Sequence, residues 1–172
     1  MIFFHPEISY KEYKNDLNEL EKISGDKLIE LGISFDKPYK AADISTILPN
    51  VKKSWYWVDA FRSSDLDQHK TDAQEHDAKS TYINENEVLG VRMREFYDNE
   101  LRDYASLLWL LNTSKDKKYN EVYKELVSKG YTDSSNVPIL GAIVYGTKDE
   151  LKSLIGNPHI KGASFGVVVD KY

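Results

Sequence analysis

An α+β fold of one domain, residues 1–172, is predicted by the order of the sequence patterns. Strand-like segments at 28–35 and 138–145 are each followed by a short helix and a return strand, so a strand-helix-strand unit occurs twice. A pair of amphipathic helices, 99–130, lies between the two units and predicts an inserted helical hairpin. A chain of this length suits one core rather than two. We therefore expect the two units to form a ferredoxin-like antiparallel sheet, with the hairpin inserted and a helix at the N-terminus.

The two units have almost the same internal spacing. Asp59 lies 24 residues after Phe35, and Asp170 lies 25 residues after Tyr145. Both short helices stop at adjacent Asn and Pro residues, which are common helix terminators. The similarity favours an internal repeat, and chance resemblance of two short units is the alternative.

The N-terminal helix is predicted from Ser9 to Gly25. Ser9 and Glu12 fit a capping box, in which each side chain satisfies a backbone N–H of the first turn. Segment 28–35 then alternates apolar and polar residues, which predicts a strand with one buried face. A short helix is expected over 41–48, and the aromatic segment 52–61 reads as the return strand.

The middle of the chain is less regular. Residues 62–87 are almost devoid of apolar side chains and predict a long polar loop. Residues 88–96 fit a short strand or a turn of helix. The helix expected over 99–111 carries so many apolar residues that burial on most sides is predicted, and a second helix over 117–129 completes the hairpin.

The second unit has clear boundaries. After the strand at 138–145, Thr147 and Glu150 form another capping box, and Gly156 ends the short helix. Residues 159–170 form the final strand, which is rich in β-branched residues.

The segment KKSWYWVDAF, residues 52–61, has two possible interpretations. Alternation places Trp55 and Trp57 on one face of a strand, with Tyr56 and Val58 on the other. Both faces are apolar, so we expect helices on both sides of this strand. Core packing is the favoured interpretation, and an aromatic platform for a ligand is the alternative.

Composition excludes several classes of protein. The chain has no cysteine, so disulfides, thiolate zinc sites and cysteine nucleophiles are excluded. Its formal net charge is −5, and its 23 basic residues are dispersed, so no nucleic-acid partner is expected. No apolar run is long enough for a transmembrane helix, and the start lacks the basic region of a signal peptide.

The polar loop contains side chains that could bind a metal ion. Its candidate ligands are Asp65, Asp67, His69, Asp72, Glu75, His76 and Asp77. Their spacing fits neither a calcium loop nor a zinc-binding helix, so a solvated loop is the favoured interpretation. No nucleophile elbow or phosphate-binding loop is present, and we expect neither catalytic residues nor a cofactor.

Four segments resemble the C-terminal domain of sigma factor regulator proteins, the membrane-bound anti-sigma factors of Gram-positive bacteria. They are HPEISYKEYKNDL, SFDKPY, SWYWVD and the ending GAIVYGTKDELKSLIGNPHIKGASFGVVVDKY, so the resemblance covers nearly all of the chain except the loop around 65–80. The resemblance implies a longer protein with a cytoplasmic region that binds a sigma factor, one membrane anchor, and this domain outside. It supplies no catalytic residues.

The resulting hypothesis is an extracytoplasmic sensor domain that binds an envelope protein or a small-molecule signal. Contact with the sigma factor and with the membrane would occur only through regions upstream of this domain. The alternatives are a metal- or carbohydrate-binding envelope module and a cytosolic enzyme. The candidate binding residues are Trp55, Trp57, Asp65, Asp67, His69 and His76.

Overall fold

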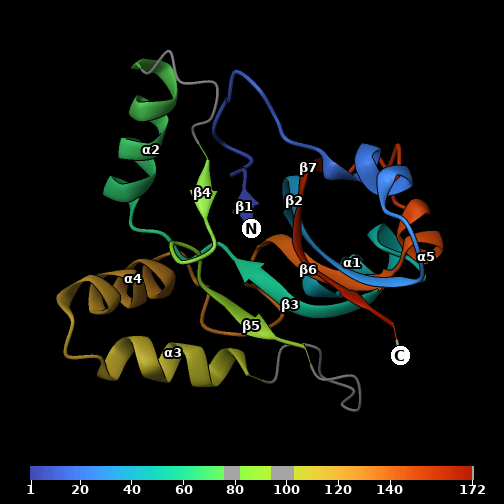
Figure 1. Cartoon of the computed structure of the whole chain (residues 1–172). Coiled ribbons are helices and arrows are strands. Elements are labelled where there is room, and N and C mark those ends of the chain that lie inside the picture. Colours follow the sequence, from blue (N-terminus) through green and yellow to red (C-terminus); the bar gives the residue numbers. More distant parts are fainter. Residues whose placement is uncertain (76–81, 94–102, 172) are drawn as a thin grey trace.

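The computed structural model describes residues 1–75, 82–93 and 103–171 (Figure 1). Within these ranges the strands form a five-stranded sheet, ordered β5-β3-β6-β2-β7, and a two-stranded sheet, β1-β4. The strands are β1 (Ile2–Phe3), β2 (Lys27–Tyr39), β3 (Lys52–Val58), β4 (Ile83–Asn84), β5 (Gly90–Arg92), β6 (Ile139–Thr147) and β7 (Ile160–Asp170). The helices are η1 (Asp16–Lys22), α1 (Ala41–Ile47), α2 (Ser63–Glu75), α3 (Tyr104–Thr113), α4 (Lys117–Ser128) and α5 (Lys148–Lys152).

The ferredoxin-like arrangement is confirmed by the strand order. The units β2-α1-β3 and β6-α5-β7 interleave, so that β6 lies between β2 and β3, and β2 lies between β6 and β7. All pairs of neighbouring strands are antiparallel. The strand β5 extends the sheet beyond β3, and the two units together form its other four strands.

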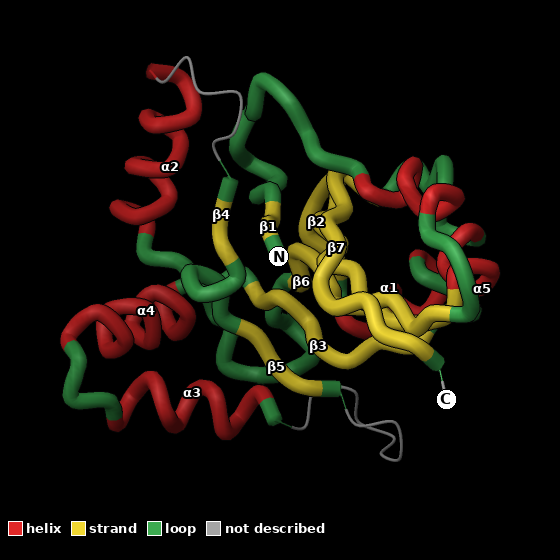
Figure 2. The backbone as a smooth tube through the Cα atoms, in the orientation of Figure 1, coloured by secondary structure: helices red, strands yellow, loops and turns green. Residues whose placement is uncertain are grey.

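The two faces of the sheet are covered by different elements. One face packs against η1, α1, α5 and the α3–α4 hairpin in the main hydrophobic core. In Figure 2, α2, the α3–α4 pair, and α1 with α5 occupy separate positions around the sheets. The other face carries Trp57 and packs against Phe3 of β1 and Ile83 of β4. The expectation of helices on both sides of β3 is therefore wrong, because the two-stranded sheet covers the Trp57 side.

The predicted start of the N-terminal helix at Ser9 is also wrong. The described helix is a 3-10 helix that begins at Asp16, after Asn15, whose side chain accepts a hydrogen bond from Leu17 N. The preceding residues run beside β7, where Lys14 O accepts a hydrogen bond from Ala163 N at 3.0 Å. Pairing with β7 takes the backbone groups that a longer helix would have used.

The polar loop expected over 62–87 is contradicted by α2 and β4. Among the residues of α2, only Ala73 is buried, and it packs against Phe4, Ile8 and Tyr10. A helix that buries so little shows no apolar stripe in its sequence, and this is why the pattern resembled a loop. Residues 76–81 lie outside the described residues.

The hairpin is confirmed, but α3 is less buried than expected. Trp109 and Leu110 are 64% and 57% exposed, whereas Tyr104 and Leu111 are buried. Residues 94–102, which include the expected start of this helix, lie outside the described ranges. None of the helices in the described parts of the chain is both long and apolar enough to cross a bilayer.

Candidate functional site

Trp57 is a core residue. Its side chain is fully buried, and its ring centroid lies 5.3 Å from that of Phe3 and 6.1 Å from that of Phe61. Its partner across the ladder is Gly141, which leaves room for the indole ring. This burial agrees with the core interpretation of the aromatic strand for Trp57.

Trp55 has a different environment, although it lies on the same face of β3. It is only partly buried, and its ring is held against the backbone of β5. A Cβ atom on Gly90 would lie 2.1 Å from Trp55 Cζ2 and 2.2 Å from Tyr56 O. The indole can occupy this position only because residue 90 is glycine.

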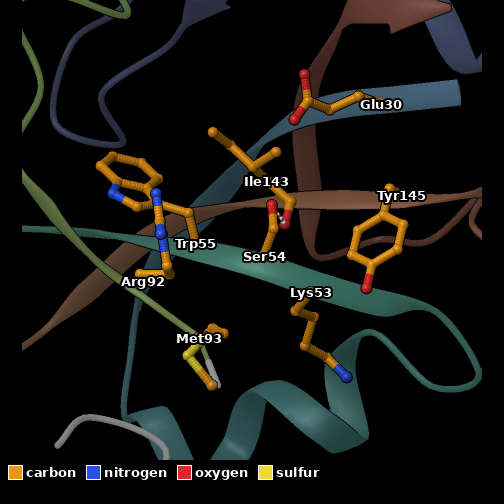
Figure 3. Close-up of a pocket in the computed structure, with 8 residues that line it drawn as sticks. All are labelled: Glu30, Lys53, Ser54, Trp55, Arg92, Met93, Ile143 and Tyr145. Carbon is orange, nitrogen blue, oxygen red and sulfur yellow. Dashed lines mark hydrogen bonds between the residues drawn. The ribbon is translucent and has the colours of Figure 1, made fainter. Parts of the chain in front are cut away.

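Trp55 lines an open groove of about 420 Å³ on this face of the sheet (Figure 3). We call it the Trp55 groove. Trp55 lies next to Arg92 at one end, as their cross-strand pairing requires, and Tyr145 and Glu30 pair at the other. Ser54 Oγ donates a hydrogen bond to Ile143 O at 3.3 Å between these ends. The groove is lined by Glu30, Lys53, Ser54, Trp55, Arg92, Met93, Ile143 and Tyr145.

The charged lining of the Trp55 groove is more basic than acidic. Lys53 and Arg92 carry positive charge, and Glu30 carries negative charge. Lys52 Nζ lies 5.8 Å above the ring of Tyr145, close to the same surface. Lys53 Nζ donates to Val51 O at 3.3 Å, so Arg92 is the cation that lies next to the indole. An aromatic ring beside one cation can accept a ligand that has both a flat apolar part and an anionic group.

Three further candidate residues, Asp65, Asp67 and His69, lie on α2 and not in the Trp55 groove. Asp65 accepts two hydrogen bonds from Arg62, at 2.9 Å from Nε and 2.6 Å from Nη2. Arg62 also binds Glu121 of α4 at 2.6 Å, and Ser63 N donates to Glu125 of α4 at 3.1 Å. The role of Asp65 in this arrangement is to help attach the first turn of α2 to α4.

We expect the pKa of Asp65 to respond to the loss of Arg62. The hydrogen bonds from the Arg62 guanidinium hold the pKa of the Asp65 carboxyl below its ordinary value. Because this pKa is lower in the folded chain than in the unfolded chain, the pair stabilises the fold above the unfolded pKa. That stabilisation is lost as the pH falls through the folded pKa.

Carboxyl titration by NMR measures this effect directly. Arg62→Gln should move the Asp65 pKa upward, and Lys70→Gln is the control because Lys70 contacts Glu7 rather than Asp65. An Asp65 pKa that does not change in Arg62→Gln would contradict the assignment of this ion pair.

His69 lies beside Asp65 on α2. Its ring meets the ring of Phe61 edge-on at 6.4 Å, and both residues line a second hollow of about 260 Å³ between α2 and α4. Asp67 is exposed on the same helix, and His76 lies outside the described residues. The structure therefore brings Asp65 and His69 together but places them in a different hollow from Trp55.

Metal binding finds no support in the described part of the chain. No group of three or more His, Asp or Glu side chains there has the geometry to hold a metal ion. The buried His5 has Nε2 3.8 Å from Asp59 Oδ1, and its ring packs edge-on against Phe61. Neither His5 nor Asp59 lines either hollow, so this pair has no access to a ligand there.

Trp55 is a candidate from the sequence, whereas the other residues that line its groove are not. Glu30, Arg92 and Tyr145 come from three other strands, and no pattern in the sequence joins them. Alternation along each strand indicates which of its side chains share a face. Knowing which residues of different strands lie next to one another also requires the order and register of the strands, which alternation does not give.

Comparison with known proteins identifies the family. No curated protein and no solved structure matches the chain. The sequence model of the family described as sigma factor regulator C-terminal matches residues 20–167. Because this match covers most of the chain, the protein belongs to the sigma factor regulator C-terminal family, whose members are regulatory domains and not a known class of enzyme.

Proposed function

We propose that this chain is the extracytoplasmic sensor domain of a membrane-anchored anti-sigma factor and that it acts by binding a ligand or a partner protein. In this proposal the signal is an envelope protein or a small molecule that contacts the Trp55 groove. The sigma factor is bound by a separate cytoplasmic region. Membership of the sigma factor regulator family supports the regulatory part of the proposal.

The observation that carries the binding part is the Trp55 groove itself. Its volume of about 420 Å³ is in the usual range for small-molecule sites. Its lining combines a fixed aromatic ring with charged groups from three strands, β2, β3 and β5, of one sheet. Sites held on strands keep their geometry better than sites held on loops.

Binding in this groove could change the state of the domain through β5. Trp55 rests against Gly90 of β5, and Arg92 of the same strand also lines the groove. A ligand that contacts both residues binds more tightly when β5 is paired with β3. Such a difference in affinity is the requirement for any ligand-driven shift between two states.

Trp55→Ala should therefore reduce signalling without unfolding the domain. Loss of a central aromatic contact commonly costs about 2 kcal/mol or more of binding free energy, which is about 30-fold in affinity. The measurement is the response of a sigma-dependent reporter to envelope stress, in cells that carry the full-length protein. Thermal unfolding of the purified domain checks that the variant is folded.

Trp109→Ala is the matched control because Trp109 is exposed on α3, away from the Trp55 groove. This variant should keep the full reporter response. If Trp55→Ala responds as well as the unmodified protein, the groove does not bind the signal and this part of the proposal fails. If Trp55→Ala unfolds, Arg92→Gln gives the same test with an exposed residue.

A further inference from the structure

The charged side chains of the Trp55 groove are separated by sign across the sheet (Figure 3). Arg92 comes from β5 and Lys53 from β3, and Lys52 of β3 adds positive charge on the same side. Glu30 comes from β2, on the far side of β6. The apolar side chain of Ile143, from β6, lies between the two sides. The groove therefore has a cationic side, an apolar middle and an anionic side.

The charges at the two sides are available to a ligand. None of the ion pairs among the described residues includes Arg92 or Glu30. Glu30 Oε2 accepts a hydrogen bond from Val167 N at 3.4 Å, and a carboxylate has room for several more donors. Lys53 is less available because its Nζ donates to Val51 O. We therefore take Arg92 and Glu30 as the charges that a ligand would pair with.

The pairing register gives the separation of these two charges. Arg92 lies opposite Trp55 on β3, which in turn lies opposite Ile143 on β6. Ile143 lies opposite Gly32 on β2, and Glu30 is two residues away from Gly32. Three strand spacings of about 4.8 Å and two residues of about 3.4 Å put the Cα atoms of Arg92 and Glu30 about 16 Å apart.

We propose that the Trp55 groove binds a short peptide with free ends, three or four residues long, whose carboxylate pairs with Arg92 and whose amine pairs with Glu30. An extended chain covers about 3.3–3.6 Å per residue, so three residues and a hydrogen bond of about 3 Å at each end span about 16 Å. A single amino acid carries both of its charges on one carbon atom and is too short. The inference rests on the proposed function, because it names the ligand class of the same groove.

The indole of Trp55 favours a large apolar side chain at the last position of the peptide. Arg92 and Trp55 are opposite one another across β5 and β3, so a carboxylate bound at Arg92 brings the last side chain to the indole. The ring is already held against Gly90, so binding does not have to order it. An aromatic last residue would pack against the indole edge-on or offset, and the middle of the peptide would lie over Ile143.

Isothermal titration calorimetry of the purified chain with the tripeptide Ala-Ala-Phe tests the proposal. Acetylation of its amine or amidation of its carboxylate removes one charged pair, and each should weaken binding about tenfold. In Glu30→Gln, acetylation should have no further effect, whereas amidation should still weaken binding about tenfold. Arg92→Gln should show the reverse pattern. Both variants should fold, because glutamine at position 30 can still accept from Val167 N and Arg92 is exposed.

The dipeptide Ala-Phe is the control for length. Its carboxylate reaches Arg92 but its amine does not reach Glu30, so acetylation should change its affinity by less than about twofold. The proposal is overturned if Ala-Ala-Phe does not bind at millimolar concentration. It is also overturned if acetylation weakens binding equally in Glu30→Gln and in the unmodified chain, or equally for the dipeptide and the tripeptide.

These results are separate from a failure of the proposed function, which the reporter measures. If Trp55→Ala abolishes the reporter response but Ala-Ala-Phe does not bind, the groove receives the signal and the peptide proposal is wrong. If the tripeptide binds with the expected dependence on both ends but Trp55→Ala keeps its full response, the ligand class is supported and the proposed function fails.

Discussion

Replacement of Trp57 by alanine should lower the free energy of unfolding by about 3–5 kcal/mol. The indole is fully buried between Phe3 and Phe61 and packs across the ladder from Gly141, so its removal leaves a cavity that these neighbours cannot fill. For a domain of this size the melting temperature should fall by about 10 °C. Urea unfolding followed by circular dichroism measures the loss.

Two further variants separate the size of the indole from its other properties. Trp57 Nε1 has no hydrogen-bond partner among the residues that the structure describes, so Trp57→Phe loses ring volume but none of the described hydrogen bonds, and it should cost only about 1–2 kcal/mol. Trp109→Ala should cost little because Trp109 is 64% exposed. A Trp57→Ala protein as stable as Trp109→Ala would contradict the assignment of Trp57 to the core.

Trp57 also illustrates how much of the fold could be predicted from the sequence. Alternation along 52–58 placed Trp55 and Trp57 on one face and Tyr56 on the other, and the two hydrophobic clusters confirm that division. The spacing of the two strand-helix-strand units predicted the interleaved sheet. The two-residue period of apolar side chains is a property of the local sequence, and it specifies which side chains of a strand share a face. The spacing between strands and helices is a local property as well.

The incorrect predictions have a common physical cause. The capping pattern at Ser9 is a local preference, and pairing of Lys14 with Ala163 of β7 overrides it. The helix α2 has almost no apolar face. Hydrogen bonds from Arg62 and Ser63 to α4, rather than burial of apolar side chains, attach its first turn to the rest of the domain. Contacts between segments far apart in the sequence decide both cases, and no local pattern records such contacts.

The candidate site follows the same rule. The sequence offers Trp55 as a ligand-binding residue in one of two interpretations, but Arg92 and Glu30, which share its groove, come from other strands whose register the sequence does not give. The sequence offers two candidate regions, the aromatic strand and the polar loop, and the structure places Trp55 in a groove on the sheet and Asp65 with His69 in a hollow between two helices. Residue type suggested the chemistry, and topology decided which residues share a site.

Gly141→Ala should be among the most damaging single changes in the sheet, at about 3 kcal/mol or more. Gly141 lies in β6, between β3 and β2, and a Cβ atom there would come within 2.2 Å of Ile33 O and 3.1 Å of Trp57 Cε3. The nearer atom belongs to the backbone of β2, so no side-chain rotation relieves the contact. Relief requires β6 and β2 to separate, which weakens the ladder that joins the two strand-helix-strand units.

Gly130→Ala is the control for this prediction. Gly130 has a φ of +79° and nothing within 4 Å of an added Cβ atom, so its replacement costs only the left-handed backbone penalty of about 1–2 kcal/mol. Both variants change glycine to alanine, and only the first adds an atom between two paired strands. Urea unfolding should give a clearly larger loss for Gly141→Ala, and amide exchange should accelerate in β2 and β6 for that variant alone. Equal losses for the two variants would mean that the sheet can open at Gly141 at little cost, which would contradict the close packing of Trp57 against this strand.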